Sequence, residues 1–126
     1  MPADDGFELL AASLRADATE LTTAVAVLAG KLEAALPQRT RVERERRMFS
    51  SARPVRSLSV TLGQDCFTLR VRDGRVEGAR EKQVGGVTIR REALDPGMWL
   101  TALTDALARE AEHSEQARTA LERLLG

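Results

Sequence analysis

The sequence predicts one α+β domain over residues 1–126, in which a long N-terminal helix and a long C-terminal helix flank an antiparallel meander of four or five strands. Two observations carry this prediction. The segment 57–72 alternates apolar and polar residues twice, on either side of a short polar turn, as half-buried hairpin strands do. The segments on either side of the central region repeat apolar residues at helical spacing instead.

The N-terminal helix is predicted to begin near Phe7, with Asp4 or Asp5 as its cap. It ends near Ala35, because Pro37 disfavours helical geometry at the residue before it. At ~1.5 Å per residue such a helix is roughly 45 Å long, which exceeds the width of a small domain. We therefore expect its apolar seam to contact a second copy in a homodimer; the alternative is packing on this chain's own second helix. The seam candidates are Leu14, Leu21, Val25, Leu28 and Leu32.

The middle of the chain predicts the strands and their turns. Segment 38–47 has Val42 as its only apolar residue, which predicts a solvated edge strand or, alternatively, a strip that binds an acidic partner. The hairpin 57–72 turns at 63–65, and Asp73 with Gly74 forms the next tight turn. A third strand over 75–82 follows, and 85–86 turns again or forms a bulge. In the last strand Val87 and Ile89 are expected on one face, with Thr88 and Arg90 on the other.

The C-terminal helix has the strongest local start signal in the chain. Asp95 is the expected N-cap, Pro96 suits the first helical position, and Leu94 with Trp99 occupies the two positions of a hydrophobic staple. The predicted helix runs from Pro96 to about Leu125. Its apolar stripe comprises Leu100, Leu103, Leu107, Ala111, Ser114, Ala117, Leu121 and Leu124.

Composition excludes several protein classes. Apolar residues at 43% and charged residues at 30% are typical of a folded globular protein. The longest apolar run, 21–30, is far shorter than the ~20 residues of a membrane span, so no membrane association is expected. The first residues lack the basic and apolar regions of a signal peptide, and the single cysteine fits a reducing compartment, so a cytoplasmic protein is expected. The preference for 17 Arg over two Lys indicates a GC-rich genome.

Charge is segregated along the chain although the net charge is zero. Residues 39–91 carry fourteen basic and six acidic side chains, whereas both flanking segments are net acidic. The segregation has three interpretations: a consequence of strand and helix composition, a basic sheet face that receives an acidic protein surface, or one that receives nucleic acid. Nucleic acid is the less expected partner, because base stacking needs exposed aromatic residues and the chain has four aromatics in all. The candidate partner-binding residues are Arg39, Arg41, Arg44, Arg46, Arg47, Arg70 and Arg72.

No catalytic, cofactor or metal site is predicted. Cys66 is expected as a small residue on the polar face of a strand, and His113 as a solvated helix residue. The Glu110-x-x-His113 spacing matches only half of a carboxylate metal motif. The glycines at 85–86 lack the Lys-Ser/Thr of a phosphate-binding loop. A small-molecule site between sheet and helix, near Phe67 and Trp99, is a further hypothesis.

The sequence therefore predicts a non-catalytic protein–protein interaction module, an adaptor or chaperone-like homodimer; the alternative is a nucleic-acid-binding protein that uses the arginine-rich sheet face. The architecture is similar in general outline to the small dimeric chaperones of bacterial secretion systems, which also join helices to a twisted antiparallel sheet. The likeness covers the order of elements and carries no residue roles.

Overall fold

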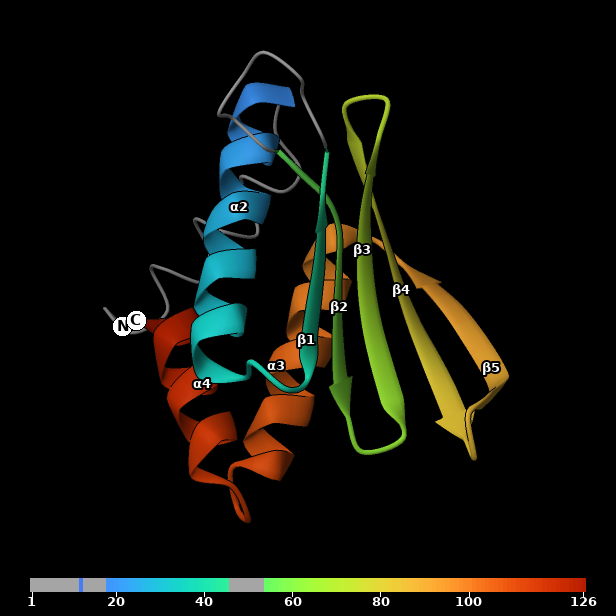
Figure 1. Ribbon diagram of the computed structural model, residues 1–126, viewed down its shortest axis with the longest axis vertical. Coiled ribbons are helices and arrows are strands. Elements are labelled where there is room, and N and C mark those ends of the chain that lie inside the picture. The colour runs from blue at the N-terminus through green and yellow to red at the C-terminus, as the bar shows by residue number, and fades with distance from the viewer. Residues whose placement is uncertain (1–11, 13–17, 46–53) are drawn as a thin grey trace.

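Five strands in chain order form one antiparallel sheet, and the helices lie together against one of its faces (Figure 1). The computed structural model describes residues 12, 18–45 and 54–126. The α+β class and the antiparallel meander are thus confirmed. The elements are α2 (Ala18–Ala35), β1 (Thr40–Arg44), β2 (Val55–Leu62), β3 (Asp65–Arg72), β4 (Arg75–Val84), β5 (Val87–Leu94), α3 (Pro96–Glu110) and α4 (Glu115–Leu125).

Two of the hairpin turns have the backbone geometry that their sequences favour. Asp73 and Gly74 have φ values of 52° and 72°, and Gly85 and Gly86 have φ values of 59° and 80°. Positive φ at both central residues matches the right-handed twist of the flanking strands, so these turns connect neighbours directly. The short turns are the reason that strand order follows chain order.

The core fills the space between the sheet and the helices. The alternate strand residues Leu58, Val60, Phe67 and Leu69 are buried, as their periodicity predicts. The rings of Phe67 and Trp99 meet edge to face, with centroids 6.5 Å apart and an interplanar angle of 84°. Neither side chain is exposed at all. The small-molecule site expected beside these two rings is therefore wrong, because side-chain packing occupies that position.

The seam of α2 packs inside the chain. The four described seam residues are at most 2% exposed, which leaves nothing for a second copy to cover: Leu21, Val25, Leu28 and Leu32. The prediction that these residues form a dimer contact is wrong, and the alternative of packing within the chain holds. Leu14 and the predicted start of this helix lie outside the described residues. Within the part of the chain that the structure describes, no helix is long and apolar enough to cross a bilayer.

The C-terminal helix is divided in two. α3 ends at Glu110, and the residues after it turn so that the His113 N–H donates to the Glu110 carbonyl at 2.9 Å. Ser114 has extended backbone angles, φ −142° and ψ 122°, and its hydroxyl accepts a hydrogen bond from the Ala117 N–H. These are the features of a helix N-cap. The prediction of one continuous helix is wrong, because the reversal lets α4 fold back and bury Ala117, Ala120 and Leu124.

Candidate interaction surface

The described helices leave the sheet face opposite them uncovered (Figure 1). We call it the open face and assign its members from strand register and alternation. The opposite positions of the same strands hold the buried core residues, so the two faces are clearly distinguished. The open face carries Arg41, Glu43, Ser57, Ser59, Thr61, Cys66, Thr68, Arg70, Arg72, Arg75, Glu77, Ala79, Glu81, Arg91 and Ala93.

A row of small side chains crosses the middle of the open face. The register places Ser59 opposite Thr68, Thr68 opposite Ala79, and Ala79 opposite Ala93. Ala79 is only 2% exposed although no described helix lies over it. The rows on either side hold longer side chains, among them Arg70 with Glu77 and Glu81 with Arg91. The centre of the face is therefore lower than its borders.

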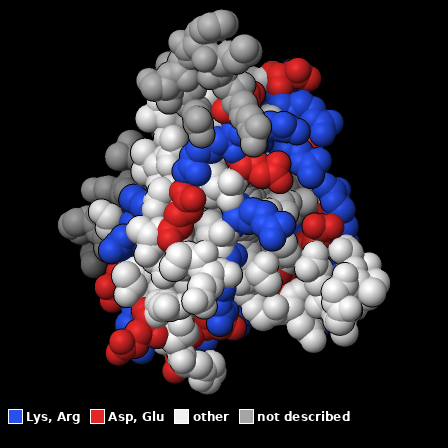
Figure 2. Space-filling model, viewed as in Figure 1, with Lys and Arg blue, Asp and Glu red and all other residues white. Residues whose placement is uncertain are grey.

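Acidic and basic groups are interleaved on the open face. Arg70 lies opposite Glu77, and Glu81 lies opposite Arg91. Opposite charges at facing positions of an antiparallel pair stabilise the sheet. Figure 2 shows red side chains among the blue ones on the side of the molecule where Figure 1 places the sheet. The alternation of strands divides the arginines between the two faces and places glutamates among them, so the open face has only a small excess of basic over acidic side chains.

The predicted partner-binding arginines do not form one strip. Arg41, Arg70 and Arg72 lie on the open face. Arg39 is exposed just before β1, and its Nη1 lies 3.5 Å from Oε2 of Glu110 at the end of α3. Arg44 lies on the helix side and is paired there, which is a correction to its predicted role. Arg46 and Arg47 lie outside the described residues.

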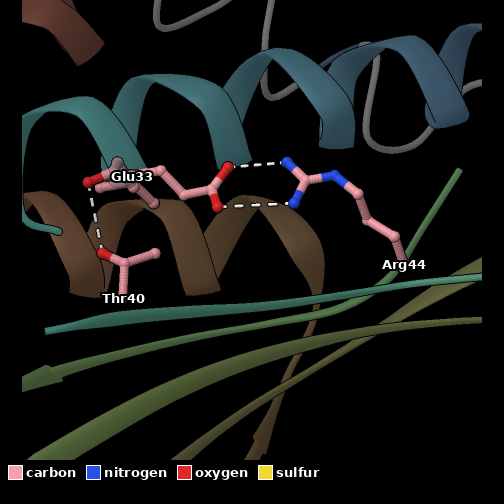
Figure 3. A network of polar contacts seen from close by, with 4 residues as sticks. Glu33, Thr40 and Arg44 are labelled. Carbon is pink, nitrogen blue, oxygen red and sulfur yellow. Dashed lines mark hydrogen bonds and ion pairs between the residues drawn. The ribbon is translucent and has the colours of Figure 1, made fainter. Parts of the chain in front are cut away.

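Arg44 joins β1 to α2 instead of facing a partner (Figure 3). Its Nη2 lies 2.7 Å from Oε1 of Glu33, and its Nη1 lies 3.4 Å from Oε2, so the pair is bidentate. Hydrogen bonding to the Glu33 carboxylate raises the pKa of Arg44 above its ordinary value. Four positions earlier on β1, the Thr40 hydroxyl donates to the Leu32 carbonyl at 3.3 Å. The two contacts hold β1 against the last turns of α2.

An open depression of about 720 Å³ lies at one end of the open face, near the start of β1. Its lining is polar, and the Thr61 hydroxyl lies 3.8 Å from the Cys66 sulfur. Among the described residues, no group of three or more His, Cys, Asp or Glu side chains is arranged to hold a metal ion. The lining residues are Gln38, Arg39, Thr40, Arg41, Ser59, Thr61, Gly63, Cys66, Gln83 and Glu110. These groups suit hydrogen bonding to a ligand or partner.

The end of the β4–β5 hairpin is a second exposed surface, which the sequence pattern did not predict. The register skips Ile89, because Gln83 pairs with Thr88 and Lys82 pairs with Arg90. This bulge brings Arg90 to the same face as Val87, so their predicted separation onto opposite faces is wrong. We call this surface the hairpin inner face; it comprises Arg80, Lys82, Val84, Val87, Arg90 and Glu92. The glycine pair at 85–86 indicated the turn of this hairpin, but no sequence feature indicated the bulge at Ile89.

Known proteins provide no assignment for either surface. No protein-family model matches the chain, no curated protein matches it, and no solved structure matches it.

Proposed function

We propose that the protein is a non-catalytic protein–protein interaction module, an adaptor or chaperone-like homodimer, whose partner surface is the open face of the sheet. One observation carries the proposal: the sheet is covered by the described helices on one side only, and its other side has a low centre of small residues between charged borders. Small side chains let a partner's backbone approach closely. Charged borders select the partner and set its register more than they add affinity.

The charge pattern favours a protein partner over nucleic acid. A nucleic acid presents a regular row of phosphates and is bound best by a continuous basic surface. Glu43, Glu77 and Glu81 interrupt such a surface, because each would face a phosphate unfavourably. A protein can instead place basic groups beside the glutamates and acidic groups beside the arginines. Five arginines against three glutamates on the open face favour a partner surface with a modest excess of acid.

The homodimer requires a contact other than the α2 seam, which is used inside the chain. Among the described residues, the open face and the two edge strands offer such a contact. Sedimentation equilibrium at tens of micromolar protein tests this part of the proposal. A species of twice the chain mass supports the dimer, whereas a strict monomer removes it and leaves a monomeric adaptor.

A pair of matched variants tests the open face. Ala93→Arg adds a long charged side chain to an exposed position of the open face, and Ala108→Arg adds the same side chain to an exposed position of α3. Tagged wild-type and variant proteins are recovered from the producing cells, and the bound proteins and nucleic acids are quantified. Loss of one protein partner with Ala93→Arg but not with Ala108→Arg is the expected result. Equal recovery with both variants contradicts the open face as the site, and salt-sensitive recovery of nucleic acid alone would support the alternative function.

A further inference from the structure

We propose that the hairpin inner face and the adjoining edge of β5 bind an extended, acidic and apolar segment of a partner protein. This surface lies on the opposite side of the sheet from the open face. The inference therefore goes beyond the proposed function, and each can fail without the other.

The path of α3 leaves the hairpin inner face uncovered. Near its start, Trp99 of α3 packs on Gly78 of β4. At its end, Glu110 lies near Gly63 in the β2–β3 turn, since a Cβ on Gly63 would be 3.8 Å from the Glu110 carboxylate. α3 thus crosses the sheet diagonally, away from the β4–β5 turn (Figure 1). The last residues of this hairpin extend past the helix layer and present their helix-side face to solvent.

Two cations face each other on this surface, and the Asp65 carboxylate of β3 lies directly opposite the first of them, Lys82. Lys82 and Arg90 occupy directly opposite positions of β4 and β5. Like charges at such positions destabilise a strand pair. Arg80 is engaged by Glu92 in the next pair along, but among the described residues neither Lys82 nor Arg90 forms an ion pair. A carboxylate placed between them would relieve the repulsion and gain two charge-assisted hydrogen bonds.

The cations border a concave space of about 290 Å³ that has room for such a group. Gln64 contributes an amide and Asp65 a carboxylate to its lining, so the space holds three cations and two carboxylates with one net positive charge. The lining residues are Gln64, Asp65, Arg80, Lys82, Arg90 and Glu92. A single acidic side chain of a partner would neutralise that excess.

An exposed apolar pair continues the same face. Val84 is 44% exposed and Val87 is 62% exposed, and the two lie directly opposite each other. Figure 2 shows an uncharged surface at the lower right, where Figure 1 places the β4–β5 turn. The apolar pair is one same-face step from the cation pair, which corresponds to roughly 7 Å along a strand. An extended segment with an acidic residue and an apolar residue two positions apart matches this spacing.

The edge of β5 selects such a segment over a second copy of itself. β5 is the last strand of the sheet, so its outer backbone groups are available to an added strand. Two β5 strands paired with each other would bring Arg90 and Arg91 close to the same residues of the second copy. The charges and the bulge at Ile89 are devices that natural sheets use against such pairing. An acidic segment would meet the same arginines favourably, and we therefore assign the surface to a partner of that chemistry.

Backbone amide chemical shifts of the intact protein test the inference during titration with a synthetic peptide. In this peptide Asp and Val are two positions apart, and Thr occupies the positions between and around them. A matched peptide with Lys in place of Asp is the control ligand. We expect saturable shifts at β5, Lys82 and Val84 with the acidic peptide only. Double charge reversal, Lys82→Glu with Arg90→Glu, should weaken binding at least ~10-fold, as expected for truncated charge pairs. Val87→Thr should weaken it by a smaller factor, and the open-face variant Arg41→Glu should leave it unchanged.

Several outcomes would overturn the inference. One is the absence of shifts at millimolar acidic peptide, and another is an equal response to the lysine peptide. Shifts of the same size along β1 would show a non-selective edge. Complete competition by inorganic phosphate, with unaltered binding to Val87→Thr, would show a simple anion site and contradict peptide recognition. Circular dichroism of each variant confirms that it is folded. Arg41→Glu, which changes the net charge by half as much as the double reversal, controls for a general electrostatic effect.

Discussion

Gly78 of β4 lies directly against the indole of Trp99 in α3. A Cβ at position 78 would come within 3.0 Å of Cδ1 and 3.1 Å of Cβ of Trp99, and within 2.8 Å of the Leu94 carbonyl oxygen. Trp99 is completely buried at this position. The absence of a side chain at residue 78 therefore allows α3 to approach the sheet closely at this point. This close approach fixes where α3 begins its diagonal path across the sheet, and that path leaves the hairpin inner face exposed.

The substitution Gly78→Ala should lower the free energy of unfolding by about 1–3 kcal/mol, as overpacking of a filled core does. The Leu94 carbonyl belongs to the backbone of β5, so it cannot give way without moving the strand. Chemical denaturation of both proteins measures the difference. Gly30→Ala is the matched control: Gly30 lies in α2, and a Cβ there would have nothing within 4 Å. It should raise stability by about 0.5–1 kcal/mol, because alanine is the better helix residue. A neutral Gly78→Ala would contradict the close approach of Trp99.

Leu28→Ala on α2 should lower the free energy of unfolding by about 2–5 kcal/mol, since Leu28 is completely buried within the chain. Val27, its neighbour, is 45% exposed, and Val27→Ala should change stability by less than about 0.5 kcal/mol. Because the seam is internal, the loss in Leu28→Ala should be the same at low and high protein concentration. If the loss of stability varied with protein concentration, the seam would be a contact between two copies of the chain.

The pair Glu33–Arg44 should contribute about 0.3–1 kcal/mol of coupling in a double-mutant cycle of Glu33→Gln and Arg44→Gln. Both side chains are about 40% exposed, at 40% and 39%, so solvent screens the pair and high salt should reduce the coupling. Partner capture by Arg44→Gln should equal that of the wild type, because Arg44 faces α2. If Arg44→Gln folds normally but no longer binds the partner, Arg44 belongs to the binding surface.

Removal of the α3 cap by Asp95→Ala should lower the free energy of unfolding by about 0.5–2 kcal/mol. Oδ1 of Asp95 accepts hydrogen bonds from the Gly97 N–H at 2.8 Å and from the Met98 N–H at 3.1 Å. Asp95→Asn retains an acceptor oxygen and should recover most of the loss. Thermal unfolding compares the three proteins. Equal destabilisation by both substitutions would show that the charge of Asp95, and not its hydrogen bonds, stabilises the helix.

Local patterns were sufficient for most of the fold. The alternation in 57–72 placed Leu58 and Phe67 in the core, and the turns at Asp73-Gly74 and Gly85-Gly86 set the order of the strands. Such signals act between residues close in the chain, so a single sequence carries them in full. The candidate surfaces were less accessible. Their composition depends on which face each charged residue occupies, and one bulge at Ile89 is enough to move Arg90.

The break between α3 and α4 shows the limit of local pattern. Segment 110–116 has residues that a helix tolerates, and its stripe continues without interruption. The chain turns there because Ala117, Ala120 and Leu124 gain more from burial against the other helices than they would in a rod that continued past the sheet. The Lys31 ammonium, which donates to the Arg123 carbonyl at 2.9 Å, links α2 to the end of the returned helix. The contacts between α2 and α4 join residues that are far apart in sequence.

By itself, the sequence determined the α+β class, an antiparallel meander of four or five strands, the buried face of the central hairpin and the start of α3, because turns, caps and periodicity are short-range properties. Only the tertiary structure decided that the α2 seam is internal, that the C-terminal helix folds back, and that the arginines are divided between two faces of the sheet. The physical reason is that burial and charge pairing are set by whichever distant residue fills the adjacent space, and short-range pattern does not specify that residue.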